Sequence, residues 1–435
     1  MKKKKLKVRK SVLICFILLV SSICFFIFNN KKEITPEVDY VSSIMAYKES
    51  ILDKDFLTWI GNNYSKEVLK SLDDSLKNGT YDKSVFHKLT GSSYIVLKDL
   101  YSKEYESRND VTIIEGKKDK ITIGYAGDVS LADNWAIMPY YNSRKKGVLG
   151  ILSEDIVSSM KSLDWMIVNS EFAFSSRGKP IKNKQYTFRA NPDNVKIYDE
   201  MGVDMVTLAN NHVYDYGKDA FLDTLTTLKN ANIPYIGAGK NNKEAESAHY
   251  LVINGYKIAF LSATRAEKYI MTPEATNDSE GVFRCYDPTR LSERIKEEKE
   301  KSDYVVAIVH WGRESTHKLE NVQKQTGKLY IDSGADMVIG HHAHVLQGME
   351  FYKGKLIAYN LGNFIFNSLT VDTGILTWSL DNDGNSEFYF LPCLQKNYRT
   401  SLVDKESALK LYKKISDWSI NVSIDENGKL YESKK

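Results

Sequence analysis

Beyond residue 120 the chain alternates short apolar segments with amphipathic ones, and this alternation restricts the fold more than any other feature of the sequence. The apolar segments have the composition of buried strands, and segments between several of them have helical periodicity. Two hairpin signals, at Asn254–Gly255 and at Gly354, add antiparallel strands. The pattern predicts an α/β domain with layered, mixed sheets. The main predicted strands are Ile121–Ala126, Trp165–Val168, Asp204–Leu208, Tyr304–Val309 and Met337–Ile339, and the clearest helices are Gly217–Lys229 and Leu319–Ser333.

The segment from 33 to 118 has a different texture. Apolar residues between Val41 and Leu76 recur at helical spacing, without strand alternation and without a catalytic pattern. We expect a helical stalk or linker here, ending at the charged break Glu115–Lys120. The main domain is then expected at 121–400, with a C-terminal tail or helix at 401–435.

The N-terminus has the pattern of a membrane anchor. Residues 1–10 carry seven Lys and Arg, and Ser11–Phe28 is an uncharged run of 18 residues, about 27 Å long as a helix. No small-residue cleavage step follows it, which favours an uncleaved transmembrane anchor at 11–28 over a cleaved signal peptide. Basic residues before the span predict a cytoplasmic tail at 1–10, one pass through the cell membrane and an extracellular main domain.

Charge and cysteine content exclude two further classes of protein. Subtracting the seven N-terminal positive charges from the net charge of +4 leaves −3 for the remainder, so the main domain is not a basic nucleic-acid binder. Outside the expected anchor only Cys285 and Cys393 remain, too few for a disulfide framework. One bridge and two buried free thiols are both compatible with the sequence.

Each main predicted strand is followed by side chains that can bind metals. The chain has eight histidines, and three of them lie in the run His341–His344. Each fragment alone also fits an ordinary turn or a buried histidine, but ligands of open α/β sheets bind beyond the carboxyl ends of the strands. Imidazole and carboxylate suit Mn, Zn or Fe. The groups at the strand ends are Asp128, Glu171, Asn211 and His212 with Asp215, His310, and His341–His344.

Seven short motifs in a fixed order resemble one known family. They are GDVSL at 127–131, NSE at 169–171, ANNHVYDYG at 209–217, GAG at 237–239, HWGRE at 310–314, GHHAHVLQ at 340–347 and NLGNFIF at 360–366. Together they resemble the CapA family, the poly-γ-glutamate capsule synthesis proteins of the calcineurin-like metallophosphoesterase superfamily. The resemblance covers about residues 121–370. It implies a four-layer α/β/β/α metallophosphoesterase-like sandwich with a two-metal centre.

The resemblance also implies roles for residues of this chain. Two divalent ions clamp a phosphoryl group and activate water near neutral pH. His212 would donate a proton to a leaving oxygen, with Asp215 orienting it, and His341 is expected to support the loop. No other cofactor is expected. The implied ligands are Asp128 for the first metal, Glu171 as a bridge, Asn211 and His310 for the second metal, and His342 and His344 divided between the two.

Three positions depart from the superfamily pattern. Ser130 stands where phosphoesterases carry the histidine of Asp-x-His, which would weaken the first metal site. Asp133 stands where the family often has arginine, and Glu171 where many phosphoesterases have aspartate. Arg189 and Arg313 are candidates for contacts with an anionic substrate, although both also fit ordinary surface arginines.

The N-terminal pattern predicts a membrane-anchored, extracellular protein, and the resemblance implies a metal-dependent hydrolase in the synthesis, export or attachment of an anionic capsule polymer. Its expected partners are the polymer or an envelope substrate and membrane polyglutamate synthase subunits, with no nucleic acid. Two alternatives remain. One is a non-catalytic accessory or scaffold subunit of the polymer synthase, and the other is an envelope phosphatase unrelated to capsule.

Overall fold

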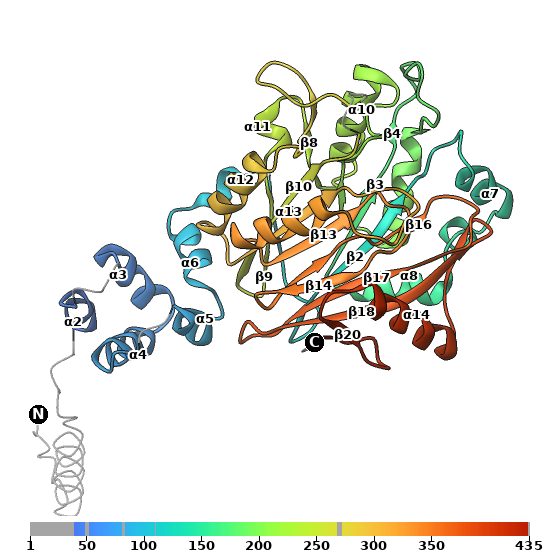
Figure 1. The fold of residues 1–435 in the computed structure, drawn as a ribbon. Coiled ribbons are helices and arrows are strands. Elements are labelled where there is room, and N and C mark those ends of the chain that lie inside the picture. The colour runs from blue at the N-terminus through green and yellow to red at the C-terminus, as the bar shows by residue number, and fades with distance from the viewer. Residues whose placement is uncertain (1–38, 48–51, 81–82, 109, 268–271, 434–435) are drawn as a thin grey trace, which may run out of the picture. The chain divides into compact units, whose positions relative to one another are not determined.

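The computed structural model describes residues 39–47, 52–80, 83–108, 110–267 and 272–433 (Figure 1). The expected cytoplasmic tail and anchor, residues 1–28, lie outside these ranges. Among the helices of the described residues, none has the length and apolar character needed to span a membrane. The chain divides into two units, residues 1–81 and 82–435.

The described part of the smaller unit is helical, as its apolar spacing predicts. Two helices begin at side-chain caps: Asp53 accepts a hydrogen bond from the backbone N–H of Phe56, and Ser65 accepts one from that of Glu67. Apolar side chains such as Leu72 are fully buried between the helices. The helices are α2 (Tyr40–Met45), α3 (Lys54–Asn63) and α4 (Lys66–Lys77).

The larger unit contains two mixed β-sheets, which we call sheet A and sheet B. Sheet A has seven strands in the order β1-β9-β10-β12-β13-β15-β14. Its three central neighbours β10, β12 and β13 run parallel, and their nearly unbroken burial explains their apolar sequences. The strands are β1 (Val111–Ile114), β9 (His249–Ile253), β10 (Tyr256–Thr264), β12 (Tyr304–His310), β13 (Met337–His341), β14 (Met349–Tyr352) and β15 (Lys355–Ala358).

Sheet B has eight strands. Seven follow the order β19-β18-β17-β2-β3-β6-β7, and β16 pairs with β2. The strands β2, β3, β6 and β7 are parallel neighbours, so their carboxyl ends lie at one edge. The strands are β2 (Ile121–Val129), β3 (Trp165–Ser170), β6 (Met205–Thr207), β7 (Tyr235–Ile236), β16 (Asn363–Ile365), β17 (Val371–Leu380), β18 (Ser386–Lys396) and β19 (Arg399–Leu402).

The two sheets pack face to face between helices, as Figure 1 shows. Side chains of both sheets, such as Ile167 and Ile308, share one core, and α14 closes that core with Leu411 and Ile415. The outer face of sheet B packs on α7–α10, and that of sheet A on α11–α13. The helices are α7 (Ile137–Arg144), α8 (Glu154–Ser162), α9 (Lys196–Met201), α10 (Gly217–Asn230), α11 (Asn242–Ala245), α12 (Thr289–Lys299), α13 (Asn321–Asp332) and α14 (Lys405–Trp418). The layers therefore follow the expected order α/β/β/α.

Both hairpins are present. The turn Asn254–Gly255 joins β9 to β10, with positive φ at both residues, and Gly354 lies in the turn between β14 and β15. Cys285 and Cys393 are buried free thiols, so no disulfide joins them. The short ladders are β4 (Ala173–Phe174) with β5 (Arg189–Ala190), β8 (Ala238–Gly239) with β11 (Gly281–Val282), and β20 (Val422–Ile424) with β21 (Leu430–Glu432).

Part of the segment expected as a helical stalk is built into the larger unit. Helices α5 (Ser84–Thr90) and α6 (Tyr94–Tyr101) precede β1, which pairs in parallel with β9. Asp99 of α6 forms a 2.6 Å ion pair with Lys257 of β10. At the C-terminus, where a tail or helix was expected, one face of α14 packs against the core between the sheets through Leu411, Tyr412 and Ile415.

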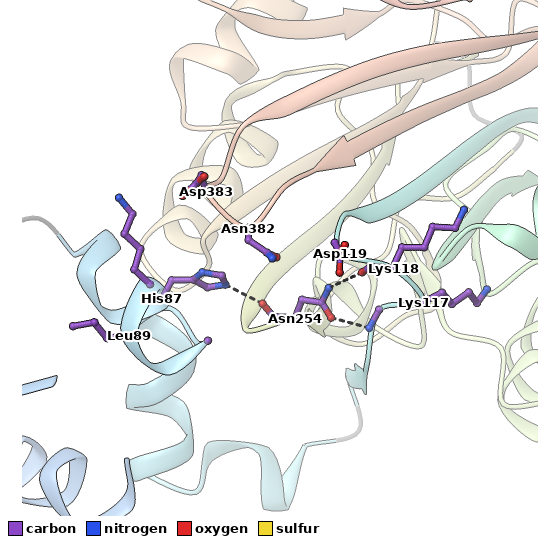
Figure 2. A pocket seen from close by; sticks show the side chains of 11 residues that line it. His87, Leu89, Lys117, Lys118, Asp119, Asn254, Asn382 and Asp383 are labelled. Carbon is purple, nitrogen blue, oxygen red and sulfur yellow. Dashed lines mark hydrogen bonds between the residues drawn. The ribbon is translucent and has the colours of Figure 1, made fainter. Parts of the chain in front are cut away.

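A polar cavity of about 730 Å³ lies where α5 meets the turns of the larger unit (Figure 2). His87 of α5 contacts the backbone oxygen of Asn254 at 3.0 Å, and the Asn254 side chain accepts a hydrogen bond from the backbone N–H of Gly116. None of the predicted site residues lines this cavity.

His249 at the start of β9 gives a prediction about acid stability. Its Nε2 lies 3.0 Å from the Thr112 hydroxyl, and its ring stacks on Trp165. Burial lowers the pKa of His249 to about 4, so between pH 6.5 and 4 the unfolded chain binds more protons than the folded one. Stability should fall by about 3 kcal/mol over this range. His249→Gln should remove that part of the loss in urea unfolding from pH 7 to 4; parallel curves for both proteins would contradict the assignment.

Candidate metal centre

The metal-competent side chains meet at the carboxyl ends of strands from both sheets. Asp128 lies near the end of β2 and pairs in register with Asn169 of β3, so Glu171 follows close beside it. In sheet A, His310 and His341 are register partners at the ends of β12 and β13. Asp128 and Glu171 are fully buried. The fold thus brings together groups that lie far apart in the sequence.

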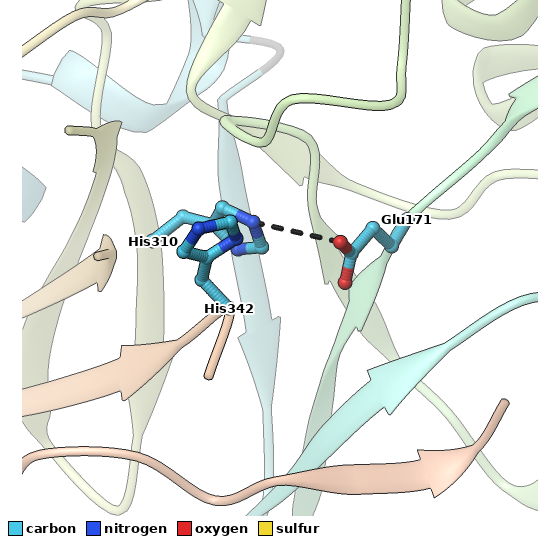
Figure 3. Close-up of side chains that lie close together, drawn as sticks. All are labelled: Glu171, His310 and His342. Carbon is cyan, nitrogen blue, oxygen red and sulfur yellow. Dashed lines mark ion pairs between the residues drawn. The ribbon is translucent and has the colours of Figure 1, made fainter. Parts of the chain in front are cut away.

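Two groups of three side chains have ligand atoms close enough to hold one ion each. In each group the ligand atoms lie within 4.8 Å of one another. We call Asp128, Glu171 and His344 position 1, and Glu171, His310 and His342 position 2 (Figure 3 shows position 2). Glu171 belongs to both, as a bridging carboxylate would. Its Oε1 lies 3.6 Å from His310 Nε2 and 3.9 Å from His344 Nε2.

Two buried atoms of these groups have no hydrogen-bond partner. They are Oε1 of Glu171 and Nδ1 of His342. Leaving such atoms unpaired in the interior costs free energy, and a cation at position 2 would remove that cost. Because carboxylate and imidazole are ligands for divalent metals, the side chains present fit such an ion.

Asn211 lies beside position 2. Its Oδ1 is 2.8 Å from His310 Nε2, where it would bind the same ion. The preceding Asn210 fixes this turn, because its side chain accepts hydrogen bonds from the backbone N–H groups of His212 and Val213. Asn210 also donates to the backbone oxygen of Ser170, which ties the turn to β3.

His212 and Asp215, which the sequence pairs as proton donor and orienting residue, are in direct contact. The distance from His212 Nδ1 to Asp215 Oδ2 is 2.7 Å, and His212 Nε2 lies 4.0 Å from Glu171 Oε1. Asp215 also accepts a hydrogen bond from the backbone N–H of Phe188. Burial lowers the pKa of His212, although Asp215 opposes this effect. His212 therefore presents Nε2 toward the metal positions.

The two carboxyl groups have opposite electrostatic environments. Burial raises the pKa of Glu171 well above its ordinary value, and the negative charges of Asp128 and Glu314 act in the same direction. Burial would also raise the pKa of Asp128, but hydrogen bonds and charges from His341 and His344 outweigh it and hold that pKa well below its usual range. Asp128 is thus the fixed anion of the centre.

The pKa values of the candidate histidine ligands are also shifted in opposite directions. Burial lowers the pKa of His342 to about 3 and that of His310 well below its ordinary value. Burial also acts to lower the pKa of His344, but Asp128 beside it outweighs this effect and raises it. Since metal ligands must be deprotonated, His310 and His342 already have the neutral form that an ion at position 2 requires.

The histidine run after β13 has an unusual backbone. His342 and His344 have φ of 95° and 58°, in the left-handed region that is unfavourable for residues with a Cβ atom. The run therefore directs these two side chains at a cost in backbone energy. His341 belongs to neither metal position; its Nδ1 lies 3.3 Å from Asp128 Oδ1, as a supporting residue would.

The two arginine candidates have different surroundings. The Arg189 guanidinium donates to the backbone oxygens of Arg177 and Gly178 and lies over the Tyr216 ring. It is thus engaged by its own loop. Arg313 is exposed and lies three residues after His310. No structural contact assigns a substrate to either residue, and their role stays a prediction.

Three residues without a predicted role complete the site. Asn169 donates to Asp128 Oδ1 at 2.8 Å and to Glu171 Oε2 at 3.0 Å. Asn363 Oδ1 lies 2.8 Å from His344 Nδ1. Both asparagines occur in the motifs NSE and NLGNFIF, which was the available signal. Lys184 is buried against Asp215, and nothing distinguishes it from the other lysines of its loop in the sequence.

Comparisons with known proteins find relatives that match the part of the chain containing the candidate metal centre. The model of the family described as bacterial capsule synthesis protein PGA_cap matches residues 122–368, which include every candidate ligand. Capsule biosynthesis protein CapA of Bacillus anthracis is 34% identical over 217 residues, 48% of this chain and 52% of that protein. PGA biosynthesis protein CapA of Bacillus subtilis is 31% identical over 265 residues, 57% of this chain and 69% of that protein. A Mycobacterium tuberculosis protein named "Probable polyglutamine synthesis accessory protein" is 27% identical over 211 residues, 46% of this chain and 55% of that protein. The match thus spans about half the length of the first and third relatives.

Proposed function

The chain belongs to the CapA family of bacterial capsule synthesis proteins, and we propose that it is a metal-dependent hydrolase acting on an anionic capsule polymer or on the envelope component that carries it. One observation carries the proposal: Glu171 is shared by two ligand groups, and the His212–Asp215 pair stands beside it. A bridging carboxylate and an adjacent proton donor are the parts that two-metal hydrolysis requires.

The residues divide the work between binding and proton transfer. Two divalent ions would polarise a phosphoryl or carbonyl oxygen and lower the pKa of water. Asp215 holds Nδ1 of His212, so the free Nε2 is the atom placed to protonate a leaving oxygen or nitrogen. Asn169 fixes Asp128 and Glu171 relative to each other. The residues that would hold the ions are Asp128 and His344 at position 1, Asn211, His310 and His342 at position 2, and Glu171 at both.

The substrate class follows from the relatives and from the chemistry. The Bacillus relatives are named for capsule and PGA biosynthesis, which supports a polymer substrate. An ester, amide or phosphoester bond would each suit a two-metal centre. Arg313 is exposed near His310 and remains our candidate for contacting the anionic chain, ahead of Arg189.

The N-terminal sequence supports a location at the cell surface. Seven basic residues precede an uncharged run of 18, so we place the N-terminus in the cytoplasm and the metal centre outside the membrane. Membrane subunits of a polyglutamate synthase would then be neighbours in the same membrane. These points rest on residues 1–28 alone.

A non-catalytic accessory subunit is the second candidate, and Ser130 favours it. Ser130 is fully buried and its hydroxyl has no hydrogen-bond partner, at the position where phosphoesterases carry a histidine ligand. Position 1 consequently has three ligands, Asp128, Glu171 and His344. In this account the chain would bind metal and polymer without cleaving either ester or amide bonds.

Metal content and hydrolysis together test the proposal. The full-length chain would be dialysed, analysed for Mn, Zn and Fe, and assayed on phosphomonoesters, phosphodiesters and poly-γ-glutamate. His342→Ala should lose the ion of position 2 and the activity. The matched control, His249→Ala, alters another buried histidine, which contacts Thr112 and Trp165 outside both ligand groups, and should keep two ions. Metal without hydrolysis would favour the accessory subunit, whereas wild-type metal content no higher than that of His342→Ala would overturn the metal centre.

A further inference from the structure

Lys184 is a lysine buried next to the metal centre. Only 5% of its side chain is exposed. Its Nζ forms a 2.8 Å ion pair with Asp215 Oδ1, contacts the backbone oxygen of Asn211 and lies 3.8 Å from Glu267 Oε2. Ammonium groups are rarely buried unless several acceptors surround them. The three acceptors around Nζ therefore offset the free-energy cost of burying Lys184.

The acceptors of Lys184 come from two segments that border position 2. Asn211 and Asp215 belong to the turn after β6, and Glu267 follows β10. The two segments are joined directly, because Asn211 Nδ2 donates to Glu267 Oε1 at 3.3 Å. The loop of Lys184 is attached to the same turn through a hydrogen bond from the backbone N–H of Ile181 to the backbone oxygen of Asp215.

The contacts of Lys184 act on both ends of the predicted machinery. By binding the Asn211 backbone oxygen, the ammonium fixes the residue whose side chain lies 2.8 Å from His310. By pairing with one oxygen of Asp215, it leaves the other oxygen for His212. One side chain thus restrains the ligand and the proton donor together.

We propose that Lys184 is a positioning residue for position 2: it holds Asn211 and the His212–Asp215 pair in the geometry that a metal ion and a leaving group require. This inference rests on the proposed function. It assigns to Lys184 no contact with substrate. Lys184 acts through its three acceptors, so its loss should weaken one of the two metal positions more than the other.

The chain offers a matched control. Lys257 is also buried, with 3% of its side chain exposed, and its Nζ pairs with Asp99 at 2.6 Å. Both lysines are buried cations that pair with an acidic residue, but Lys257 lies on β10 against α6 and contacts none of the site residues. If any buried lysine were needed for metal binding merely because it stabilises the fold, replacing Lys184 and replacing Lys257 would lower the metal affinity alike.

The experiment measures Mn²⁺ or Zn²⁺ affinity by chelator competition, together with thermal unfolding, in full-length wild type, Lys184→Met, Lys184→Arg and Lys257→Met. Wild type should bind two ions. Lys184→Met should keep one ion and bind the other about 10- to 100-fold more weakly, as losses of supporting residues do. Lys184→Arg should restore most of that affinity, and Lys257→Met should lose thermal stability but keep both ions.

A second variant covers the case in which Lys184→Met fails to fold. Lys184→Met combined with Asp215→Asn removes the buried carboxylate that Lys184→Met alone would leave without its cation, and this double variant should also bind one ion weakly. Two ions bound by both Lys184→Met proteins with wild-type affinity would overturn the inference, as would an equal loss in Lys257→Met. A wild type without any metal would overturn it together with the metal centre. Wild type that binds two ions but hydrolyses nothing would count against the hydrolase alone, because the affinity comparison still decides the role of Lys184.

Discussion

Glu171→Gln is expected to abolish metal binding at both positions while leaving the metal-free protein folded. Glu171 is the residue common to the two ligand groups, and an amide is a much poorer ligand than a carboxylate. Loss of a supporting residue alone costs roughly 10- to 100-fold in metal affinity, so loss of the bridge should cost more than about 100-fold at each position. The metal-free variant should unfold no earlier than metal-free wild type, because Gln removes a carboxyl buried beside Asp128.

The measurement is the shift in unfolding temperature on adding Mn²⁺ or Zn²⁺. A ligand at 100 times its Kd stabilises the folded state by about 2.7 kcal/mol, so wild type should shift and Glu171→Gln should not. The matched control is Glu350→Gln, since Glu350 of β14 is also buried but pairs with Tyr359 and with Lys328 of α13. It should lose stability and retain the metal-dependent shift. A metal-dependent shift in Glu171→Gln equal to that of wild type would disprove the bridge.

Gly340→Ala is expected to unfold most easily of the single substitutions considered. A Cβ at residue 340 would lie 1.8 Å from the backbone oxygen of Tyr359 and 2.5 Å from Trp311 Nε1. These two atoms are hydrogen-bonded to each other, so they hold each other in place. Residue 340 itself lies in β13, which is paired on both sides with β12 and β15, so the backbone of residue 340 cannot move away from them. Overpacking commonly costs about 1–3 kcal/mol, and a clash with sheet backbone should reach about 3 kcal/mol or more.

The same substitution should also displace the histidines that follow Gly340 in the chain. Metal content and denaturant unfolding are the readouts, with Gly327→Ala in α13 as the control. There the nearest atoms are side-chain atoms of Ile357 at 3.3 and 3.4 Å, a much smaller overlap than at Gly340, and alanine favours a helix over glycine by about 1 kcal/mol. The control should unfold no earlier than wild type. Wild-type stability and metal content in Gly340→Ala would show that the contact is not as close as described.

Strands with a clear pattern in their own residues were predicted, whereas a strand that depends on a distant partner was not. The strands β12 and β13 were predicted because parallel strands buried on both faces have apolar sequences. The edge strand β1 was missed because it is four residues long, exposes Ile113 to 59% and pairs with a partner far along the chain. Because β1 belongs to sheet A, the segment 33–118 that was expected to form one stalk is divided between the two units of the chain.

The candidate site shows the same division. The candidate ligands could be proposed from the sequence because they follow the carboxyl ends of strands, and these ends meet where the two sheets pack together; their binding of metal remains a prediction. Lys184 was missed because burial is a property of the fold, and a lysine-rich loop gives no indication of which lysine is enclosed. Arg189 was chosen for its charge, whereas the structure directs its guanidinium to backbone oxygens of its own loop.

The origin of the ligands in two different sheets has a consequence for the order of folding. Asp128 and His342 are 214 positions apart, so neither metal position exists in a chain whose sheets have formed but not yet docked. Contacts of such large sequence separation form late and slowly. Capture of an ion during refolding should therefore coincide with closure of the sandwich, and time-resolved metal uptake would report when the protein becomes native.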